Sequence, residues 1–260
     1  MLLQLLLLQV LPCHSTTIDI VANEVVGGGS VQTVAELQAL LDGHPNTVFR
    51  VRSSSWQIDA AAPKSIWLRD NRTLLMDSQT VIENPAGALL PSTYVQKAGG
   101  EAITGYGALL TVSGNNIGVV GGRFHQQPQN LTCTWGKPAC NFAIDIFRSS
   151  GVKLRDSVVQ GSFGSSVRIQ ESFGTGVTPG HPPVAMHWST LPGLARQPVF
   201  ITNVTLLHHS NASFYQVRGF WTVTAQNVIF TRNRIIGEFM YSIDLDSSSS
   251  GNLVHNNYYA

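Results

Sequence analysis

The feature that most constrains the fold is a short phrase that recurs at a regular interval near the end of the chain. An asparagine followed by an apolar or β-branched run begins at Asn203, Asn227 and Asn252, so successive copies start 24 and 25 residues apart. Repeats of this length indicate stacked supersecondary units, each of which buries its apolar face only against its neighbours. Phrases of the same shape begin upstream at Asn116 and Gly151.

A second phrase runs in step with the first, and one apolar residue anchors each copy. The anchors are Ile144, Val167, Val217 and Ile243. The 50-residue gap before the third anchor contains a Pro- and Gly-rich insertion, Glu171 to Gln197, whose removal restores a 23-residue interval. The segments are short, rich in Val, Ile, Thr and Phe, and bounded by Gly, Asn and Ser, which is typical of β-strands. One such strand per turn predicts an all-β fold, a parallel β-helix.

A helix is expected just before the first strand. Ser30 is a suitable N-cap, and Gly43 ends the pattern. One apolar stripe follows the helical period, at Val31, Val34, Leu37, Leu40 and Leu41. Such a helix would cap the open end of the stack. Another turn begins at Asn252 with no capping segment after it, so we expect the C-terminal turns to be incomplete.

The composition suits a continuous core and excludes some partners. Hydrophobic residues make up 43% of the chain, charged residues 12%, and the net charge is +1, which argues against nucleic-acid binding. Residues 1–15 have the pattern of a secretion signal, because Leu2 to Leu11 is apolar but too short to span a bilayer. The alternative is a fragment of a membrane anchor. We expect a secreted monomer with one domain, 16–260, and no membrane span after signal removal.

Modification sites fit this extracellular setting. Acceptor sequons for N-glycosylation occur at Asn71, Asn130, Asn203 and Asn211. Cys133 and Cys140 form an even pair in one loop, which favours a local disulfide in a secreted chain. No Cys or His pair has zinc-ligand spacing, and no calcium motif is present. We therefore expect no cofactor, with calcium as the alternative that no motif supports.

With these turns and the N-terminal helix, the chain resembles the pectin-lyase-like superfamily of right-handed parallel β-helices. The resemblance covers most of residues 30–260, and the stretch from Val34 to Glu83 is similar to the family's opening. It implies a single-stranded right-handed parallel β-helix with a short N-terminal capping helix. The superfamily contains lyases, hydrolases, epimerases and non-catalytic surface proteins, so the resemblance leaves the reaction open.

One motif resembles the active-site motif of a particular enzyme family within this superfamily. Tyr241-Ser-Ile-Asp-Leu-Asp-Ser distantly resembles the Tyr-Gly-Phe-Asp-Pro-His-Asp motif of mannuronan C5-epimerases. Tyr241 and Asp244 match, whereas Asp246 stands where that family has its catalytic His. The paired aspartates of polygalacturonases are absent from the chain.

Aligning the second phrase places one charged residue of each turn in a column. The column reads Asp145, Arg168, Arg218 and Asp244. Each residue follows an inward anchor, so all four are expected to point outward, with neighbours about 4.8 Å apart. Two central arginines suit a carboxylate. The sequence thus favours elimination or C5-epimerisation of an acidic polysaccharide, with Arg168 and Arg218 binding the uronate. Tyr241 or His255 would act as the base that removes the C5 proton.

Other interpretations remain open. Asp246 follows Asp244 by two residues, so their carboxyls should lie about 6–7 Å apart, which suits a glycoside hydrolase. The charged column is also consistent with an exposed ion-pair ladder that binds nothing, in a non-catalytic cell-surface protein. Trp188, in the second long loop, either stacks on a sugar ring or pins its own loop.

Overall fold

The structure is a computed structural model. It describes residues 16–58, 65–85, 95–98, 101–104, 107–126, 142–161, 165–170, 198–208, 218–223, 225–246, 249 and 251–260. These residues form mainly β-strands, together with one α-helix, α2 (Val34–Gly43). Most of the strands pair in parallel, so the prediction of an all-β fold is confirmed.

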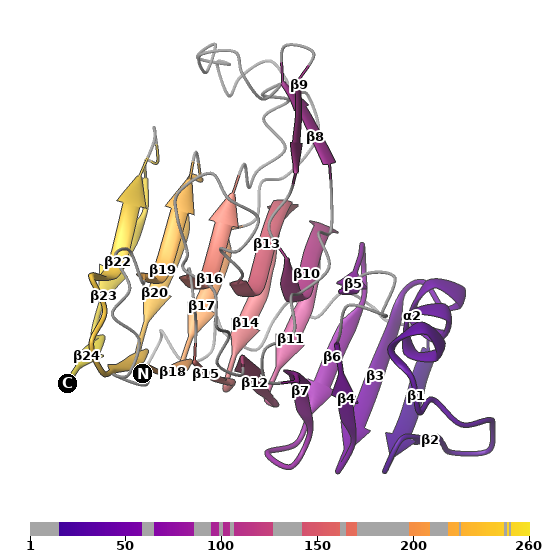
Figure 1. Ribbon diagram of the computed structural model, residues 1–260. Coiled ribbons are helices and arrows are strands. Elements are labelled where there is room, and N and C mark those ends of the chain that lie inside the picture. Colours follow the sequence, from indigo (N-terminus) through magenta and orange to yellow (C-terminus); the bar gives the residue numbers. More distant parts are fainter. Residues whose placement is uncertain are drawn as a thin grey trace, which may run out of the picture.

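The strands described make three sheets and a separate hairpin (Figure 1). In pairing order, sheet A contains β2 (Glu24–Val25), β1 (Thr16–Val21), β3 (Thr47–Arg52), β6 (Thr73–Met76), β11 (Gly118–Val120), β14 (Lys153–Arg155), β17 (Val199–Thr202), β20 (Val228–Thr231) and β23 (Leu253–His255). Sheet B contains β4 (Ser55–Gln57), β7 (Val81–Asn84), β12 (Arg123–Gln126), β15 (Val158–Gln160), β18 (Thr205–Leu207), β21 (Arg234–Ile236) and β24 (Tyr258–Tyr259).

Sheet C contains β5 (Ile66–Leu68), β10 (Ala108–Asn115), β13 (Phe142–Ser150), β16 (Ser165–Gln170), β19 (Arg218–Val223) and β22 (Tyr241–Asp246). The hairpin pairs β8 (Val95–Ala98) with β9 (Glu101–Thr104) in antiparallel fashion. From β10 onward the chain visits sheets C, A and B in a fixed rotation, and each full rotation is called a circuit below. Each circuit therefore adds one strand to every sheet.

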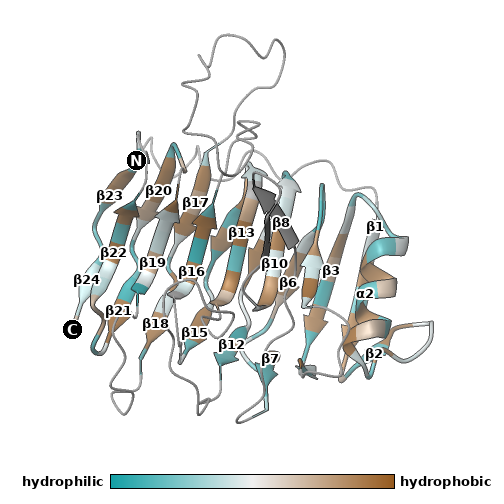
Figure 2. Ribbon diagram, turned by 45° about the horizontal axis from the view of Figure 1, so that its top comes forward, coloured by the Kyte–Doolittle hydropathy of each residue, from teal (hydrophilic) through white to brown (hydrophobic). Residues whose placement is uncertain are grey.

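The core runs through the middle of the stack as columns of apolar side chains. In sheet C one column continues from Leu110 through Ile144 and Val167 to Phe220, and each of these residues is fully buried. Figure 2 shows the corresponding hydrophobic bands along the strands. Because every circuit buries its apolar residues against the circuits on either side, the core is continuous along the stack.

Asparagine takes up the tight corners, as the repeated phrase predicts. Asn203 and Asn227 have φ of 54° and 58°, in the left-handed region that asparagine tolerates better than most residues. Asn252 acts differently, since its side-chain oxygen accepts a 2.8 Å hydrogen bond from the backbone N–H of Val228 in the preceding circuit. The phrases that begin at Asn116 and Gly151 also start paired strands, β11 and β14.

The register of the first phrase is wrong at one step. Asn203 precedes β18 in sheet B, whereas Asn227 precedes β20 in sheet A. Sheet A aligns Val199 with Val228, an offset of 29 residues rather than 24. The cause is the connection at 208–217, which is longer than its counterpart at 237–240, so the equal spacing of the two asparagines is a coincidence.

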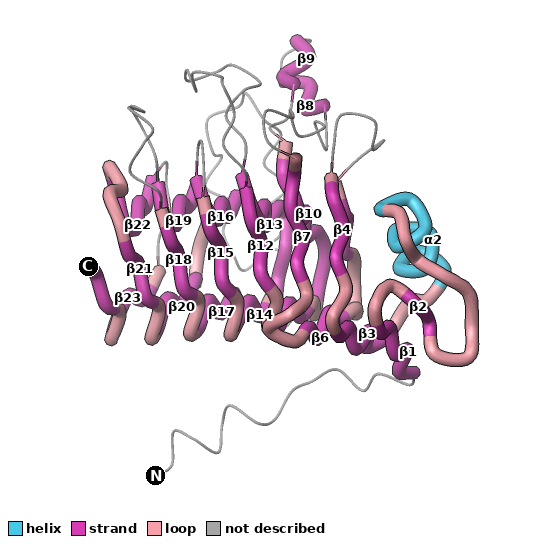
Figure 3. Tube along the Cα trace, turned by 60° about the horizontal axis from the view of Figure 1, so that its bottom comes forward, coloured by secondary structure: helices cyan, strands magenta, loops and turns pink. Residues whose placement is uncertain are grey.

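Helix α2 lies at the N-terminal end of the stack (Figure 3). It buries Leu37 and Leu41, as predicted, and Gln38 makes two hydrogen bonds to the backbone of Trp67 in β5. The predicted N-cap is wrong. Thr33 caps the helix and forms a capping box with Glu36, because its hydroxyl lies within reach of the free N–H of Glu36. Strands β1 and β2 also precede the helix, which was not expected.

The last circuit, β22 to β24, leaves apolar side chains uncovered. Leu245 extends an interior column of sheet C and is 47% exposed, and Tyr259 follows Ile235 in sheet B and is 49% exposed. Within the part of the chain that the structure describes, no strand pairs with the outer edge of β22, β23 or β24. No helix among the residues described is long and apolar enough to cross a membrane.

Candidate functional site

The strands of sheet C carry two consecutive inward residues, which interrupts the usual alternation. In β19 these are Gly219 and Phe220. A Cβ atom on Gly219 would clash with the backbone oxygen of Ser242 in β22 and would lie 3.1 Å from the buried Leu206 side chain, and Phe220 belongs to the core. Arg218 and Trp221, three residues apart, consequently both project from the outer face. The candidate site is this outer face.

One column of the outer face is continuous across the sheet. It reads Trp67, Thr111, Asp145, Arg168, Trp221 and Asp244. The predicted alignment of Asp145 with Arg168 is confirmed. Figure 2 shows hydrophilic bands in β13 and β16, the strands that carry this pair.

The predicted place of Arg218 in this column is wrong. Arg218 lies three residues earlier, opposite Tyr241 of β22, and Trp221 occupies the column position. The reason is the interior anchor: Phe220, not Val217, pairs with Val167. Val217 itself lies outside the residues described.

Asp145 and Arg168 form a buried ion pair rather than an exposed ladder. The guanidinium donates two hydrogen bonds to the carboxylate, Nε to Oδ1 at 3.0 Å and Nη2 to Oδ2 at 2.7 Å. The Arg168 and Asp145 side chains are 3% and 0% exposed, and the guanidinium carbon lies 4.2 Å from the ring centre of Phe142. The prediction that Arg168 is available to a substrate is therefore wrong, because its charge is already neutralised out of contact with solvent.

Arg218 has a more open environment. Its Nε lies 2.5 Å from Oδ2 of Asp244, with side-chain exposures of 13% and 20%. Its guanidinium carbon lies 4.6 Å from the ring centre of Trp221 and 5.7 Å from that of Tyr241. The two aromatic rings and the carboxylate hold this cation in one orientation at the surface.

A second carboxylate borders the same group. Asp246 follows Asp244 along the outer face of β22, and Trp221 Nε1 donates a 3.4 Å hydrogen bond to Asp246 Oδ2. Tyr241, at the start of the same strand, is 44% exposed. The Arg218 cluster is thus defined as Arg218, Trp221, Tyr241, Asp244 and Asp246.

His255 does not join this cluster. It lies in β23 of sheet A, opposite Thr231, whereas Tyr241 lies in sheet C. The prediction that either residue could serve as base at one site is therefore corrected to Tyr241. The two residues are separated because consecutive strands of one circuit belong to different sheets.

The predicted glycosylation and disulfide residues are described in part. Asn71 and Asn203 both lie at left-handed corners. Asn71 Oδ1 accepts a hydrogen bond from Asn116, and Asn203 Nδ2 donates one to Asp156. The remaining predicted residues lie outside the part that the structure describes: Trp188, Cys133, Cys140, Asn130 and Asn211. Among the residues described, no three His, Cys, Asp or Glu side chains gather as a metal site would require.

Sequence reasoning missed Trp221 and Phe142 as members of the outer face. Their ring centres lie 6.1 Å apart, and both side chains are almost fully buried. The run Gly219-Phe220-Trp221 held the signal, since a glycine beside a large apolar residue inside a strand indicates an irregularity in the alternation. No family model, curated protein or solved structure matches the chain.

Proposed function

We propose that this chain is a right-handed parallel β-helix that binds and modifies an acidic polysaccharide at the Arg218 cluster. The handedness rests on the rotation of the chain through three parallel sheets, because crossovers between parallel strands are right-handed in about 98% of cases. The function rests on one observation. Arg218 is a partly exposed cation held between two aromatic rings, on a face that extends across several circuits.

The cluster offers the groups that a uronate reaction needs. Aromatic faces suit the apolar faces of sugar rings, and a fixed guanidinium suits a carboxylate. Arg218 would exchange Asp244 for the substrate carboxylate and stabilise the enolate-like charge that forms when the C5 proton leaves. Tyr241, as phenolate, would take that proton. In elimination the bond from C4 to the leaving oxygen then breaks, a C4–C5 double bond forms, and the leaving oxygen takes a proton from the Tyr241 phenol or from water. In epimerisation water donates a proton to C5 from the opposite face, and the proton on Tyr241 is released to solvent.

A second candidate, glycoside hydrolysis, is favoured by the charge of the cluster. Arg218 is accompanied by two carboxylates, Asp244 and Asp246, on one face of β22. One carboxyl would donate a proton to the leaving oxygen, and the other would act as nucleophile or as base toward water. A non-catalytic glycan-binding protein is the third possibility, and it needs no reacting groups.

Several expectations about processing and setting remain proposals. They are secretion with removal of residues 1–15, a monomeric domain over 16–260, the Cys133–Cys140 disulfide and the four glycans. They are supported by the apolar N-terminal run, the paired cysteines and the sequons. The corner positions of Asn71 and Asn203 suit glycan attachment at the surface, since such bends interrupt the sheets.

Incubation with a panel of uronate and neutral polymers tests the reaction. We expect unsaturated products, read by ultraviolet absorbance, or inverted C5 centres, read by NMR, from uronate polymers. Tyr241→Phe should lower this rate about 100-fold or more, because it removes the proton acceptor. Tyr258→Phe, on an exposed tyrosine of sheet B, is the matched control.

Three outcomes distinguish the candidates. New reducing ends without unsaturated product, abolished by Asp246→Asn, would replace elimination with hydrolysis. Binding to a polymer without any product would support the non-catalytic protein. Equal rates for Tyr241→Phe and the control would remove Tyr241 from the mechanism.

A further inference from the structure

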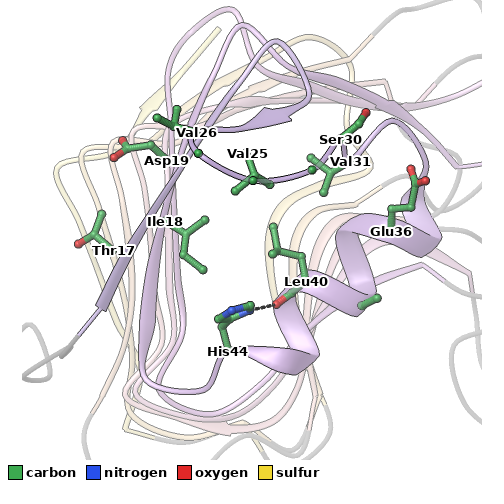
Figure 4. Close-up of a pocket in the computed structure, with 14 residues that line it drawn as sticks. Thr17, Ile18, Asp19, Val25, Val26, Ser30, Val31, Glu36, Leu40 and His44 are labelled. Atoms are coloured by element: carbon green, nitrogen blue, oxygen red, sulfur yellow. Dashed lines mark hydrogen bonds between the residues drawn. The ribbon is translucent and has the colours of Figure 1, made fainter.

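A cavity of about 660 Å³ opens at the N-terminal end of the stack, between β1 and α2 (Figure 4). Its volume lies within the range of roughly 300–1,000 Å³ that is usual for ligand sites. The apolar lining comes from Ile18, Val25 and Leu40, which are half-buried and pack on the edge of the core. Figure 4 shows Ile18 and Leu40 on opposite sides of the opening.

One wall of this cavity is the edge of sheet A. Strand β2 pairs with β1 at Ile20 and Val21, and Val26 N–H donates to Asp19 O, after which the chain turns away at Gly27. Ala22 N–H donates a hydrogen bond to the backbone oxygen of Arg52 in β3. Successive residues of a strand direct their backbone N–H and C=O groups to opposite sides, so those of Thr17 point away from β3. Among the strands described, none pairs with β1 at Thr17 on that side. Among the residues described, the edge is therefore open where the cavity lies.

The rim of the cavity is acidic. Asp19 and Glu36 are among its lining residues, which include no lysine or arginine. The backbone and side-chain hydrogen bonds of Thr33 lower the pKa of Glu36, so its carboxylate is charged at neutral pH. Asp19 lies 3.7 Å from Arg52 and opposite Arg50 in β3, but the side chains of the Asp19–Arg52 pair are 32% and 60% exposed, so that attraction is weak.

We propose that this cavity, with the free edge of β1, binds an extended peptide in which apolar and basic residues alternate. The peptide adds a strand beside Thr17 by main-chain hydrogen bonds. Its inward side chains enter the cavity between Ile18 and Leu40, since these residues face the interior. Its outward side chains lie on the face that carries Asp19, where a basic residue is favoured. The site is independent of the Arg218 cluster, which lies in sheet C.

A fluorescent hexapeptide of alternating lysine and valine, titrated with the full chain and followed by anisotropy, tests this proposal. Wild type should bind it and should bind a glutamate–valine peptide at least about tenfold more weakly. Thr17→Pro should reduce the affinity at least tenfold, because proline removes the edge N–H. Thr17→Val, which keeps that N–H, should bind as wild type does. Asp19→Asn should weaken binding about two- to fivefold, as expected for an exposed ion pair.

A second variant tests the proposal in case Thr17→Pro does not fold. Gly29 lines the cavity, and a Cβ atom there meets nothing within 4 Å, so Gly29→Phe adds a ring at the cavity wall and should also abolish binding. Circular dichroism confirms the fold of each variant. Equal binding of the two peptides, no binding to wild type, or unchanged binding by both Thr17→Pro and Gly29→Phe would overturn the proposal.

Discussion

At the scale of single residues, burial decides which arginine can serve a ligand. Arg168 and Arg218 both contact a carboxylate and an aromatic ring in sheet C. Arg168 is enclosed and fully paired with Asp145, whereas Arg218 keeps part of its side chain in solvent. The sequence predicted both residues on this sheet, but it could not distinguish their roles, because the burial of a side chain depends on what packs over it rather than on its own strand.

Replacing Arg168 with alanine should destabilise the protein by about 3–5 kcal/mol, because it leaves the Asp145 carboxylate buried without a partner. Arg218→Ala should cost less, about 1–3 kcal/mol, since each side chain of its pair keeps some contact with solvent and the change also removes the contacts with Trp221 and Tyr241. Urea denaturation of both variants measures the difference. Equal losses of stability would show that the Asp145–Arg168 pair does not hold sheet C together.

At the scale of elements, local patterns predicted the strands well and their register less well. Strands β3 and β6 begin at Thr47 and Thr73, in short runs rich in β-branched and apolar residues, which is the composition that predicts strands. The alignments of Asn203 with Asn227 and of Val217 with Val167 are wrong. Both errors follow connections of unequal length, and a repeated phrase does not reveal how many residues a connection contains.

The cap of α2 provides a test at this scale. Thr33→Ala should lower the free energy of unfolding by about 1 kcal/mol, because the N–H of Glu36 loses its acceptor. Ser30→Ala, at the predicted cap, should leave stability unchanged. Thermal unfolding of the two variants measures this contrast, and a larger loss for Ser30→Ala would contradict the observed capping box.

The cap should also respond to pH. The pKa of Glu36 is lowered from its ordinary value of 4.5 by backbone and side-chain hydrogen bonds with Thr33. A lowered folded-state pKa means that the contribution of Glu36 is present above pH 4.5 and is lost as the pH falls through the lower value. The difference between wild type and Thr33→Ala should therefore shrink in acid.

At the scale of the whole molecule, the two proposed sites lie at separate places on the stack. Sheet C presents Arg218 on a face that spans several circuits, where the proposed function places an extended acidic polymer. The N-terminal end presents Asp19 and Glu36 around an open cavity, where the second proposal places a basic segment. Because each circuit contacts mainly its neighbours, a change at one surface should have little effect on the other.

Equilibrium binding of an oligouronate, measured by titration calorimetry, tests the proposed polysaccharide site most directly. Arg234 is the matched control, because its guanidinium lies 5.8 Å from the ring of Tyr258, a similar stacking geometry on sheet B. Arg218→Ala should weaken binding at least about tenfold, as for loss of a charge-assisted contact, while Arg234→Ala should bind as wild type does. Equal affinities for wild type and Arg218→Ala, or equal losses in both variants, would contradict a uronate site at the Arg218 cluster.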